Sequence, residues 1–502
     1  MMNFLIFLFA IFYLILAKLR LDWAVLLIII ALPSYLIRFN VLTLPATLLE
    51  LMIWLAFLVW VITNYHELKT KIKRIFKKDK NLVKVDYPFK WEIILLLIIS
   101  FAAVAVAGFT NSALGIWKAY FFEPILFYIL IFNIFRGNEG RKKVFLALAV
   151  SALVVSLLAI YQKITGQLID NLLWQALATR RVVSFFGYPN AVGLFLGPII
   201  LLLIGYLVEK SRTQFKNSNF QFPISNFQTN SKFQIPKQYQ YNIFNIIIVT
   251  LTIILSLLAI YFAKSKGALA GVAIGVVVFF FLAGRKRVKW GIIFFVLAAI
   301  IGISVCQSCR NYVLDKTIYS KSYQIRRAGW QEAKKMLLDG RIISGAGLAN
   351  YQQAVAPYHQ TGVFLEDYRD PRWLDKILAS AEFRQKNWQP LEIYLYPHNI
   401  FLNFWTEIGL AGVLLFIWII GKFLYLGFVN LFRNWKLEIR NSEGEKSNKF
   451  IVIGLMCSMI VIIIHGLVDA PYFKNDLAMM FWLLVALAGM INLDLKLNKN
   501  LK

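Results

Sequence analysis

Residues 450–493 read FIVIGLMCSMIVIIIHGLVDAPYFKNDLAMMFWLLVALAGMINL, two long apolar runs separated by one short polar stretch. Each run is continuous and does not alternate between apolar and polar residues, which favours a helix over a strand of a membrane barrel. Each is also close to the ~20 residues that a helix needs to cross a bilayer. The pattern predicts a helical hairpin in a membrane, and the rest of the chain repeats it.

The whole chain is too apolar for a soluble protein. Of its 502 residues, 59% are hydrophobic and 16% are charged, against about 45–50% and about 25% in soluble domains. The sequence predicts an all-α polytopic membrane protein with about 12–13 transmembrane helices. The first run lacks the basic start and the cleavage site of a signal peptide, so we expect a retained helix. The thirteen runs cover 3–19, 23–39, 45–64, 92–109, 117–135, 144–163, 188–207, 243–263, 267–283, 291–306, 399–421, 450–469 and 476–493.

The net charge of +28 is explained by the orientation of the chain in the membrane and does not indicate nucleic-acid binding. Positive charges gather in short connections between apolar runs, which is the pattern of cytoplasmic loops in membrane proteins. Four such connections each follow an odd-numbered run, so a single orientation places all of them in the cytoplasm. The N-terminus is then outside; if the first run does not cross, both ends are cytoplasmic. These connections lie within 65–90, 136–143, 285–289 and 433–440.

Two connections are unusual. Residues 211–241 repeat Ser, Asn, Phe and Gln without a helical period, which predicts a disordered cytoplasmic insertion. Residues 307–395 mix charges of both signs with aromatics, and the orientation places this long, usually functional loop outside. We expect four parts: N-terminal helices (1–170), core helices with the insertion (171–306), a large outer loop domain (307–395), and C-terminal helices with a cytoplasmic tail (396–502).

The three cysteines suggest no metal centre. Cys457 lies within an apolar run, where packing explains it. Cys306 and Cys309 form a single CxxC at the end of a run, and two ligands do not close a zinc site. On the outer side this pair is either a small disulfide loop or two idle thiols.

Polar groups at the outer ends of the spans are the candidates for function, because ionisable residues close to lipid are costly. Each cluster also has a structural interpretation, such as a helix start, a lysine reaching lipid phosphate, an arginine stacked on an aromatic ring or a glycine turn. The GxG lacks the strand and helix of a nucleotide site, so we expect a turn. The clusters are Arg180-Arg181 with Gly187-Tyr188-Pro189-Asn190, Lys264-Ser265-Lys266-Gly267, Arg326-Arg327 with Trp330 and Gly345-Ala346-Gly347, Pro397-His398-Asn399 with Glu407, and His465 through Asp469.

Taken in order, these clusters resemble the membrane-embedded O-antigen ligase and O-antigen polymerase family. The likeness covers roughly residues 180–490 and includes the spacing of Arg326 and Trp330 and the segment Ile343-Ser344-Gly345-Ala346-Gly347. Proteins of this family join a glycan from a polyprenyl-diphosphate carrier to an acceptor on the outer face of the bacterial cytoplasmic membrane. The resemblance implies a helical fold like that of C-type membrane glycosyltransferases, and no metal, nucleotide sugar or ATP.

The resemblance also implies roles for individual residues. His398 is the candidate base, and Arg326 and the Ser-Lys hairpin are expected to hold the diphosphate. Lys266 departs from the family, which usually has Arg there; Lys keeps the charge but loses the bidentate fork. Further candidate cations for the diphosphate are Lys264, Arg180, Arg181 and Arg327, and the supporting candidates are Asn190, Asn399 and Asp469.

The chemistry of the residues agrees with this expectation. A departing diphosphate develops negative charge, which fixed cations stabilise. An acceptor hydroxyl must lose a proton, and a histidine, with an unperturbed pKa of about 6.5, suits that step. Three other interpretations stay open: a polymerase whose acceptor is a second lipid-linked glycan, a flippase for such lipids, and a membrane scaffold. A transporter predicts internal repeats and polar residues at mid-membrane, and the sequence shows neither.

Overall fold

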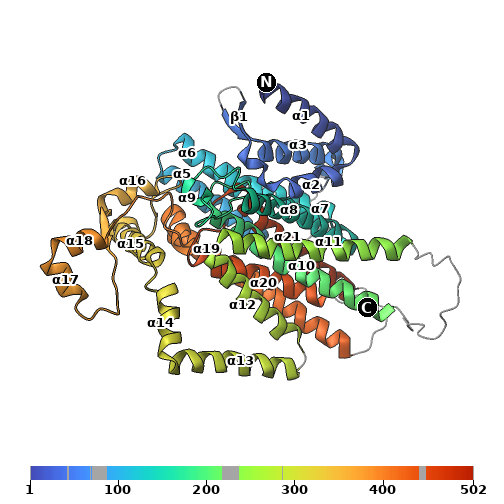
Figure 1. Cartoon of the computed structure of the whole chain (residues 1–502). Helices are drawn as coiled ribbons and strands as arrows, with labels where there is room; N and C mark the ends of the chain where they lie inside the picture. Colours follow the sequence, from blue (N-terminus) through green and yellow to red (C-terminus); the bar gives the residue numbers. More distant parts are fainter. Residues whose placement is uncertain are drawn as a thin grey trace.

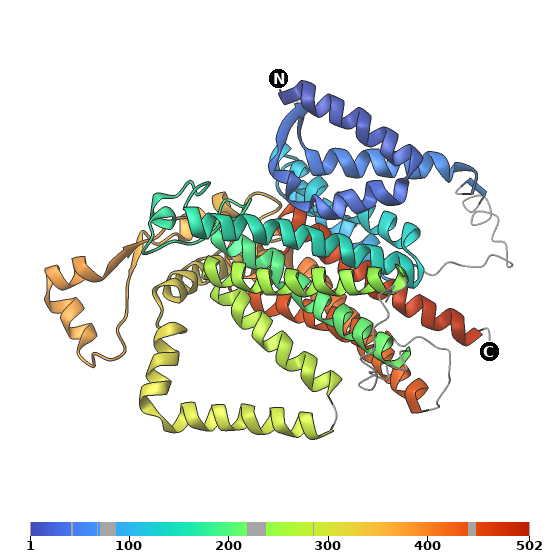
Figure 2. The same ribbon diagram turned by 45° about the vertical axis from the view of Figure 1, so that its right-hand side comes forward.

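The computed structural model describes residues 2–41, 44–67, 69–70, 87–217, 237–284, 286–439 and 448–500. Over these residues the chain is a bundle of helices with a smaller group of elements projecting from one end (Figures 1 and 2). Within the described ranges, nine helices are long and apolar enough to cross a membrane. The predicted fold class, an all-α polytopic membrane protein, is confirmed. The predicted number of spans is larger, because the first four apolar runs form shorter helices.

The N-terminal part of the chain contains those shorter helices. The prediction of a single helix over 23–39 is wrong. Helix α2 has ten residues, or about 15 Å, half of a bilayer core of about 30 Å. Pro33 then starts a 3₁₀ turn, and the chain continues into a β-hairpin. The elements are α1 (Met2–Leu19), α2 (Leu21–Ile30), η1 (Leu32–Leu36), β1 (Arg38–Val41), β2 (Leu44–Thr47), α3 (Leu48–Thr63) and α5 (Lys90–Val106).

The middle of the chain forms long helices. The range 211–241 predicted as an insertion overlaps two helices, since α10 continues to Asn217 and α11 begins at Lys237. Residues 218–236 lie outside the described residues. The elements are α6 (Asn111–Trp117), the π-helical turn η2 (Lys118–Phe122), α7 (Glu123–Ile134), α8 (Gly137–Thr165), α9 (Leu172–Gln175), α10 (Pro189–Asn217) and α11 (Lys237–Ala263).

The two runs of the hairpin 450–493 lie at the centre of the bundle. They form α20 (Lys449–Gly466) and α21 (Asn475–Asn500), and nearly all side chains described in them are buried. Helix α10 packs closely against α20: a Cβ on Gly205 would lie 2.5 Å from the carbonyl oxygen of Phe450. Only glycine permits this approach. Cys457 is buried within α20, as the apolar sequence around it predicts.

Helices α12 (Lys266–Ala283), α13 (Lys286–Val305) and α14 (Gln307–Lys316) lead from the bundle to the projecting segment. Figure 2 shows α13 lying away from the other helices, and none of its described side chains is buried. Such an apolar surface suits contact with lipid. Cys306 and Cys309 form a disulfide at the start of α14, which decides between the two predicted states of this pair.

The projecting segment has a small core of its own. Ala333, Met336, Tyr351 and Val355 pack together beside the bundle. Strands β3 and β4 form an antiparallel pair, and α17 and α18 lie farthest from the bundle (Figure 1). The elements after α14 are α15 (Lys321–Met336), η3 (Leu337–Arg341), α16 (Tyr351–Val355), η4 (Ala356–Tyr358), β3 (Gly362–Phe364), α17 (Trp373–Ala379), α18 (Ala381–Asn387) and β4 (Trp388–Pro390).

The Gly345-Ala346-Gly347 stretch is a turn, and it fixes the projecting segment to helix α19 (Ile400–Ile439). The Ala346 N–H donates to the Thr406 carbonyl at 2.7 Å. The Ala349 N–H donates to the buried Glu407 carboxylate at 2.8 Å. Helix α19 is kinked at Gly409, whose φ is 73°, and a Cβ there would collide with the Ile343 carbonyl oxygen of the turn. Glu407 therefore has a structural contact, and the turn anchors the start of α19, which follows His398.

Candidate active site

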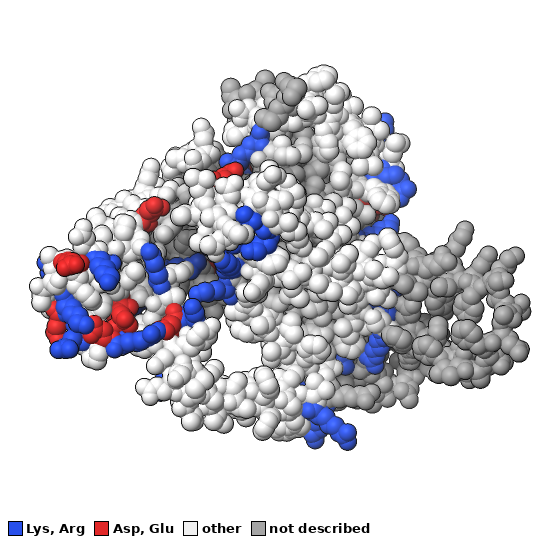
Figure 3. Space-filling view, viewed as in Figure 1, with Lys and Arg blue, Asp and Glu red and all other residues white. Residues whose placement is uncertain are grey.

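The ends of six helices meet where the projecting segment joins the bundle. They are the starts of α10, α12, α19 and α21 and the ends of α11 and α20. The Asn399 side chain donates to the Leu467 carbonyl at 3.1 Å, and Gly267 packs against the ring of His465. Figure 3 shows Lys, Arg, Asp and Glu on the projecting segment and near this junction, while much of the visible flank of the bundle is uncharged. Clusters far apart in the sequence are therefore brought together at one end of the bundle.

His398 lies at this junction in a constrained backbone conformation. Its φ is +47°, a left-handed value that is uncommon for a residue with a side chain and is found at functional sites. The Trp330 indole N–H donates to the Pro397 carbonyl at 2.7 Å. Asn399 accepts from the N–H groups of Phe401 and Leu402, at 3.0 Å each, and so caps α19. The residues on both sides of His398 are thus fixed by hydrogen bonds.

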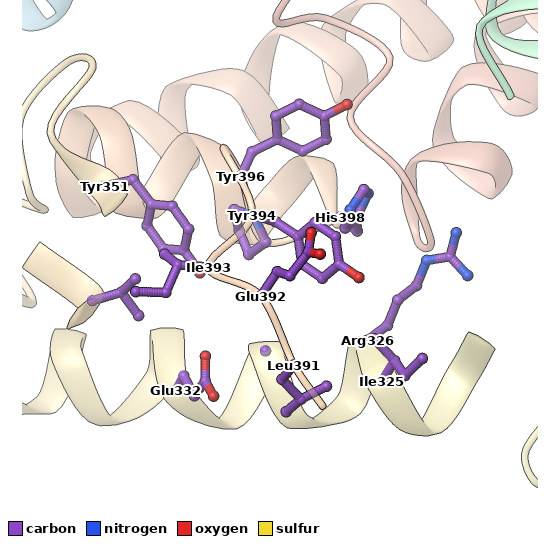
Figure 4. Close-up of a pocket in the computed structure, with 13 residues that line it drawn as sticks. Ile325, Arg326, Glu332, Tyr351, Leu391, Glu392, Ile393, Tyr394, Tyr396 and His398 are labelled. Carbon is purple, nitrogen blue, oxygen red and sulfur yellow. The ribbon is translucent and has the colours of Figure 1, made fainter. Parts of the chain in front are cut away.

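Two tyrosines enclose the His398 ring. Tyr394 and Tyr396 occupy alternate positions before His398, and both rings meet the imidazole edge to face at 4.9 and 5.0 Å. Together with residues of α15 they line a small pocket that is partly open to the outside. Figure 4 shows Arg326 and His398 at one end of this pocket and Glu332 and Tyr351 at the other. The pocket therefore offers aromatic faces, carboxylates and one guanidinium.

A chain of polar side chains leads away from His398 into the protein. Its Nδ1 lies 3.7 Å from the Asp469 carboxylate, which is longer than a hydrogen bond, and is otherwise without a partner. Asn190 donates to Asp469 at 3.2 Å, and Arg181 donates to Asn190 at 3.3 Å. Burial alone would raise the pKa of the Asp469 carboxyl, but the two nearby histidine rings and the Ala470 N–H lower it to about 2. Asp469 is therefore a buried anion facing His398.

Two arginines at this end of the bundle are near enough for their charges to interact. Arg181 donates to the Ala263 carbonyl at 3.0 Å, and both its burial and the charge of Arg326 lower the pKa of its guanidinium. Arg326 is bonded to Ser322 one turn earlier in α15, but its buried Nε has no partner. A guanidinium with an unused buried donor and a second guanidinium whose charge it feels favour the binding of an anion.

The other predicted cations are placed differently. Arg180 donates to the carbonyls of Lys163 and Ile164, at 3.0 and 3.2 Å, and so closes the end of α8. Arg327 is exposed on α15, about 100° around the helix from Arg326. Lys264 and Lys266 are exposed on either side of the buried Ser265. Lys266 donates to the Lys316 carbonyl at the end of α14 at 3.3 Å.

Sequence reasoning missed several residues of the pocket. The Tyr394-x-Tyr396-x-His398 alternation was a usable signal, because alternate residues of an extended segment share a side. Glu332 had no such signal: it is buried in α15 and accepts from the Gln360 N–H at 2.8 Å. Across the described part of the chain, no cluster of three His, Cys, Asp or Glu side chains could hold a metal ion.

The fold and site define a class: a helical membrane protein whose polar residues gather at one end of its spans around a histidine, a buried aspartate and two arginines. The sequence model of the O-antigen ligase family matches residues 251–417. This match confirms the resemblance to that family over this range. Lys266, Arg326 and His398 lie within it; Arg181, Asn190 and Asp469 lie outside it. No curated protein sequence matches the chain.

Proposed function

We propose that this protein transfers a glycan from a polyprenyl-diphosphate carrier to an acceptor at the outer face of the cytoplasmic membrane. The observation that carries the proposal is the placement of His398 between the buried Asp469 carboxylate and the pocket that Arg326 lines. A base, a fixed anion behind it and unpaired cations beside it are the groups that this reaction needs.

In the proposed reaction, His398 accepts the proton of the acceptor hydroxyl. If Nδ1 carries the hydrogen that faces Asp469, the other ring nitrogen is free to accept. The acceptor oxygen forms a bond to the anomeric carbon of the donor sugar. The bond from that carbon to the diphosphate oxygen breaks, and its electron pair leaves with the diphosphate. Arg181 and Arg326 stabilise the added negative charge.

The position of the site suits a substrate held in lipid. It lies at one end of the apolar helices, beside the projecting segment, while the C-terminal end of α21 lies at the other end of the bundle (Figure 1). In the predicted orientation the C-terminus is cytoplasmic, which places the pocket outside. The polyprenyl tail can then stay in the bilayer while its head group reaches the pocket.

Two acceptor classes fit these residues. A ligase transfers the glycan to a lipid or protein, and a polymerase transfers it to a second lipid-linked glycan. A flippase is the more distant alternative, because its substrate site is expected near the middle of the membrane. Here Asn190, His398 and Asp469 lie at or next to the ends of membrane-spanning helices.

Deletion in the native host followed by size analysis of its glycans tests the proposal. We expect long chains stranded on the carrier if the protein is a ligase. Loss of long chains with single units retained indicates a polymerase. An unchanged glycan profile, with normal attachment to acceptors, would contradict the proposed transfer.

A further inference from the structure

Lys474 is a cation near this site that the proposed reaction does not use. It lies in the turn between α20 and α21, and its N–H donates to the Tyr472 carbonyl at 2.7 Å. Tyr472 is fully buried, donates to the Tyr120 carbonyl at 2.9 Å and accepts from the Trp482 indole at 3.1 Å. The backbone that carries Lys474 is therefore held firmly by the core.

The ammonium of Lys474 rests on an aromatic ring. Its Nζ lies 4.0 Å from the centre of the Tyr188 ring. Within the described chain it forms no hydrogen bond and has no carboxylate at ion-pair distance. Burial lowers the pKa of this amine, the more distant Asp476 and Asp469 raise it, and Arg38 lowers it. The aromatic ring is the only direct partner of this half-buried ammonium, and it does not fully replace the water that the ammonium loses on burial.

Tyr188 connects this lysine to the catalytic pocket. The hydroxyl of Tyr396 lies 3.5 Å from the hydroxyl of Tyr188, and the Tyr396 ring meets the His398 ring at 5.0 Å. Figure 4 shows Tyr396 and Arg326 on different sides of His398. Lys474 thus lies on the Tyr188 and Tyr396 side of His398, whereas Arg326 lies on the other side.

We propose that Lys474 forms a second anion-binding subsite, which takes a phosphate or diphosphate group of a lipid-linked substrate on the Tyr188 and Tyr396 side of His398. The inference rests on the proposed function for the identity of the substrate. A phosphate fits because it is a compact anion that a single ammonium binds as a point charge. The group comes either from the donor or from an acceptor that itself carries phosphate.

The first experiment measures binding without any transfer. The protein is placed in nanodiscs of phosphatidylcholine and titrated with sugar-free polyprenyl diphosphate. We expect Lys474→Met to weaken binding by about 10- to 100-fold, as for loss of a charge-assisted contact, and Lys474→Arg to restore most of it. Lys163→Met is the matched control, because the Lys163 Nζ also lies over a ring, 5.6 Å from the centre of Phe262, but takes no part in the contacts of Tyr188, Tyr396 and His398. Unchanged binding in Lys474→Met, with normal thermal stability, would overturn the proposal.

Footprinting of the unmodified chain keeps the test independent of a folding defect. An amine-acylating reagent should label Lys474 more slowly when polyprenyl diphosphate is present, with Lys163 unaffected. Equal labelling of Lys474 with and without the lipid would also overturn the proposal. If binding depends on Lys474 but no glycan is ever transferred, the proposed function fails and the subsite stands.

The His398→Gln variant, which should bind its substrates without turnover, shows whether the donor or the acceptor supplies the anion. Protection of Lys474 by lipid-linked glycan donor alone assigns the subsite to the donor. Stronger protection by a phosphate-bearing acceptor than by the donor, each added alone, assigns it to the acceptor. In steady-state assays of Lys474→Met, the KM of that same substrate should rise while kcat stays within about threefold.

Discussion

Two sets of polar residues at the same end of the bundle differ in how deeply they are buried and in whether hydrogen bonds link their members. The first set is Arg181, Asn190 and Asp469, which hydrogen bonds connect, with His398 Nδ1 3.7 Å from the buried Asp469 carboxylate. The second set is the exposed hairpin of Lys264 and Lys266, with Arg327 on the outer face of α15. Fixed, buried groups stabilise charge far better than exposed, mobile ones. We therefore expect the rate of the chemical step to depend on the first set. The rate at which the carrier lipid associates with the protein should depend on the second set.

The largest effect should follow His398→Gln. An amide cannot accept the proton, so turnover should fall by about 10²–10⁴-fold. The measurement is transfer at equal levels of membrane protein. His359→Gln is the control, because this second histidine faces the carboxylate of Glu332 at 3.4 Å outside the proposed chain; it should keep most of its activity. Similar turnover in the two variants would remove His398 from the mechanism.

Asp469→Asn should reduce turnover by about 10²-fold, which is part of the contribution expected of a general base. The pKa of Asp469 is about 2, below the ~3.9 of an unperturbed aspartate, so the carboxylate is ionised at every pH from 5.5 to 9. The loss should therefore be present at every pH in that range. The control is Asp370→Asn, which breaks only a surface pair with Lys376. A loss confined to one end of the range would contradict this assignment.

Arg181 and Arg180 are neighbours with different contacts, and they offer a matched pair. Arg181→Met should reduce transfer by about 10- to 100-fold, because a charge-assisted contact is lost. Arg180→Met should leave transfer within about threefold but lower the thermal stability, since the carbonyls at the end of α8 lose their donors. Turnover and melting temperature are measured on the same preparations. The reverse pattern would show that the two roles are exchanged.

The smallest effect should follow Lys266→Ala. Its ammonium is exposed and contacts a carbonyl of α14, so we expect a loss of a few-fold that shrinks as salt rises. Lys266→Arg should retain full activity. Transfer is compared at low and high ionic strength. A loss as large as that of His398→Gln would place Lys266 in the transition state and erase the distinction between the two sets.

The sequence was sufficient for the helices because continuous apolar runs are a local signal. It failed at 23–39, where the run is mostly apolar but Pro33 starts a different backbone. It identified His398, Asp469 and Arg181 as candidates without showing that they meet. Asn190 and Asp469 are 279 positions apart, and no local pattern encodes such a contact. For the same reason Arg180 and Arg181 could not be separated: both are arginines at a helix mouth, and only the packed structure shows which carbonyls they reach.

Reconstituted transfer tests the central proposal most directly. The purified protein is placed in sealed vesicles with a polyprenyl-diphosphate-linked glycan labelled in its sugar, together with the acceptor fraction of its host. We expect the label to move to the acceptor while sugar-free polyprenyl diphosphate accumulates in equal amount, with wild-type protein but not with His398→Gln. Label that stays on the carrier and only crosses to the other leaflet, equally in both proteins, would contradict glycan transfer and indicate a flippase.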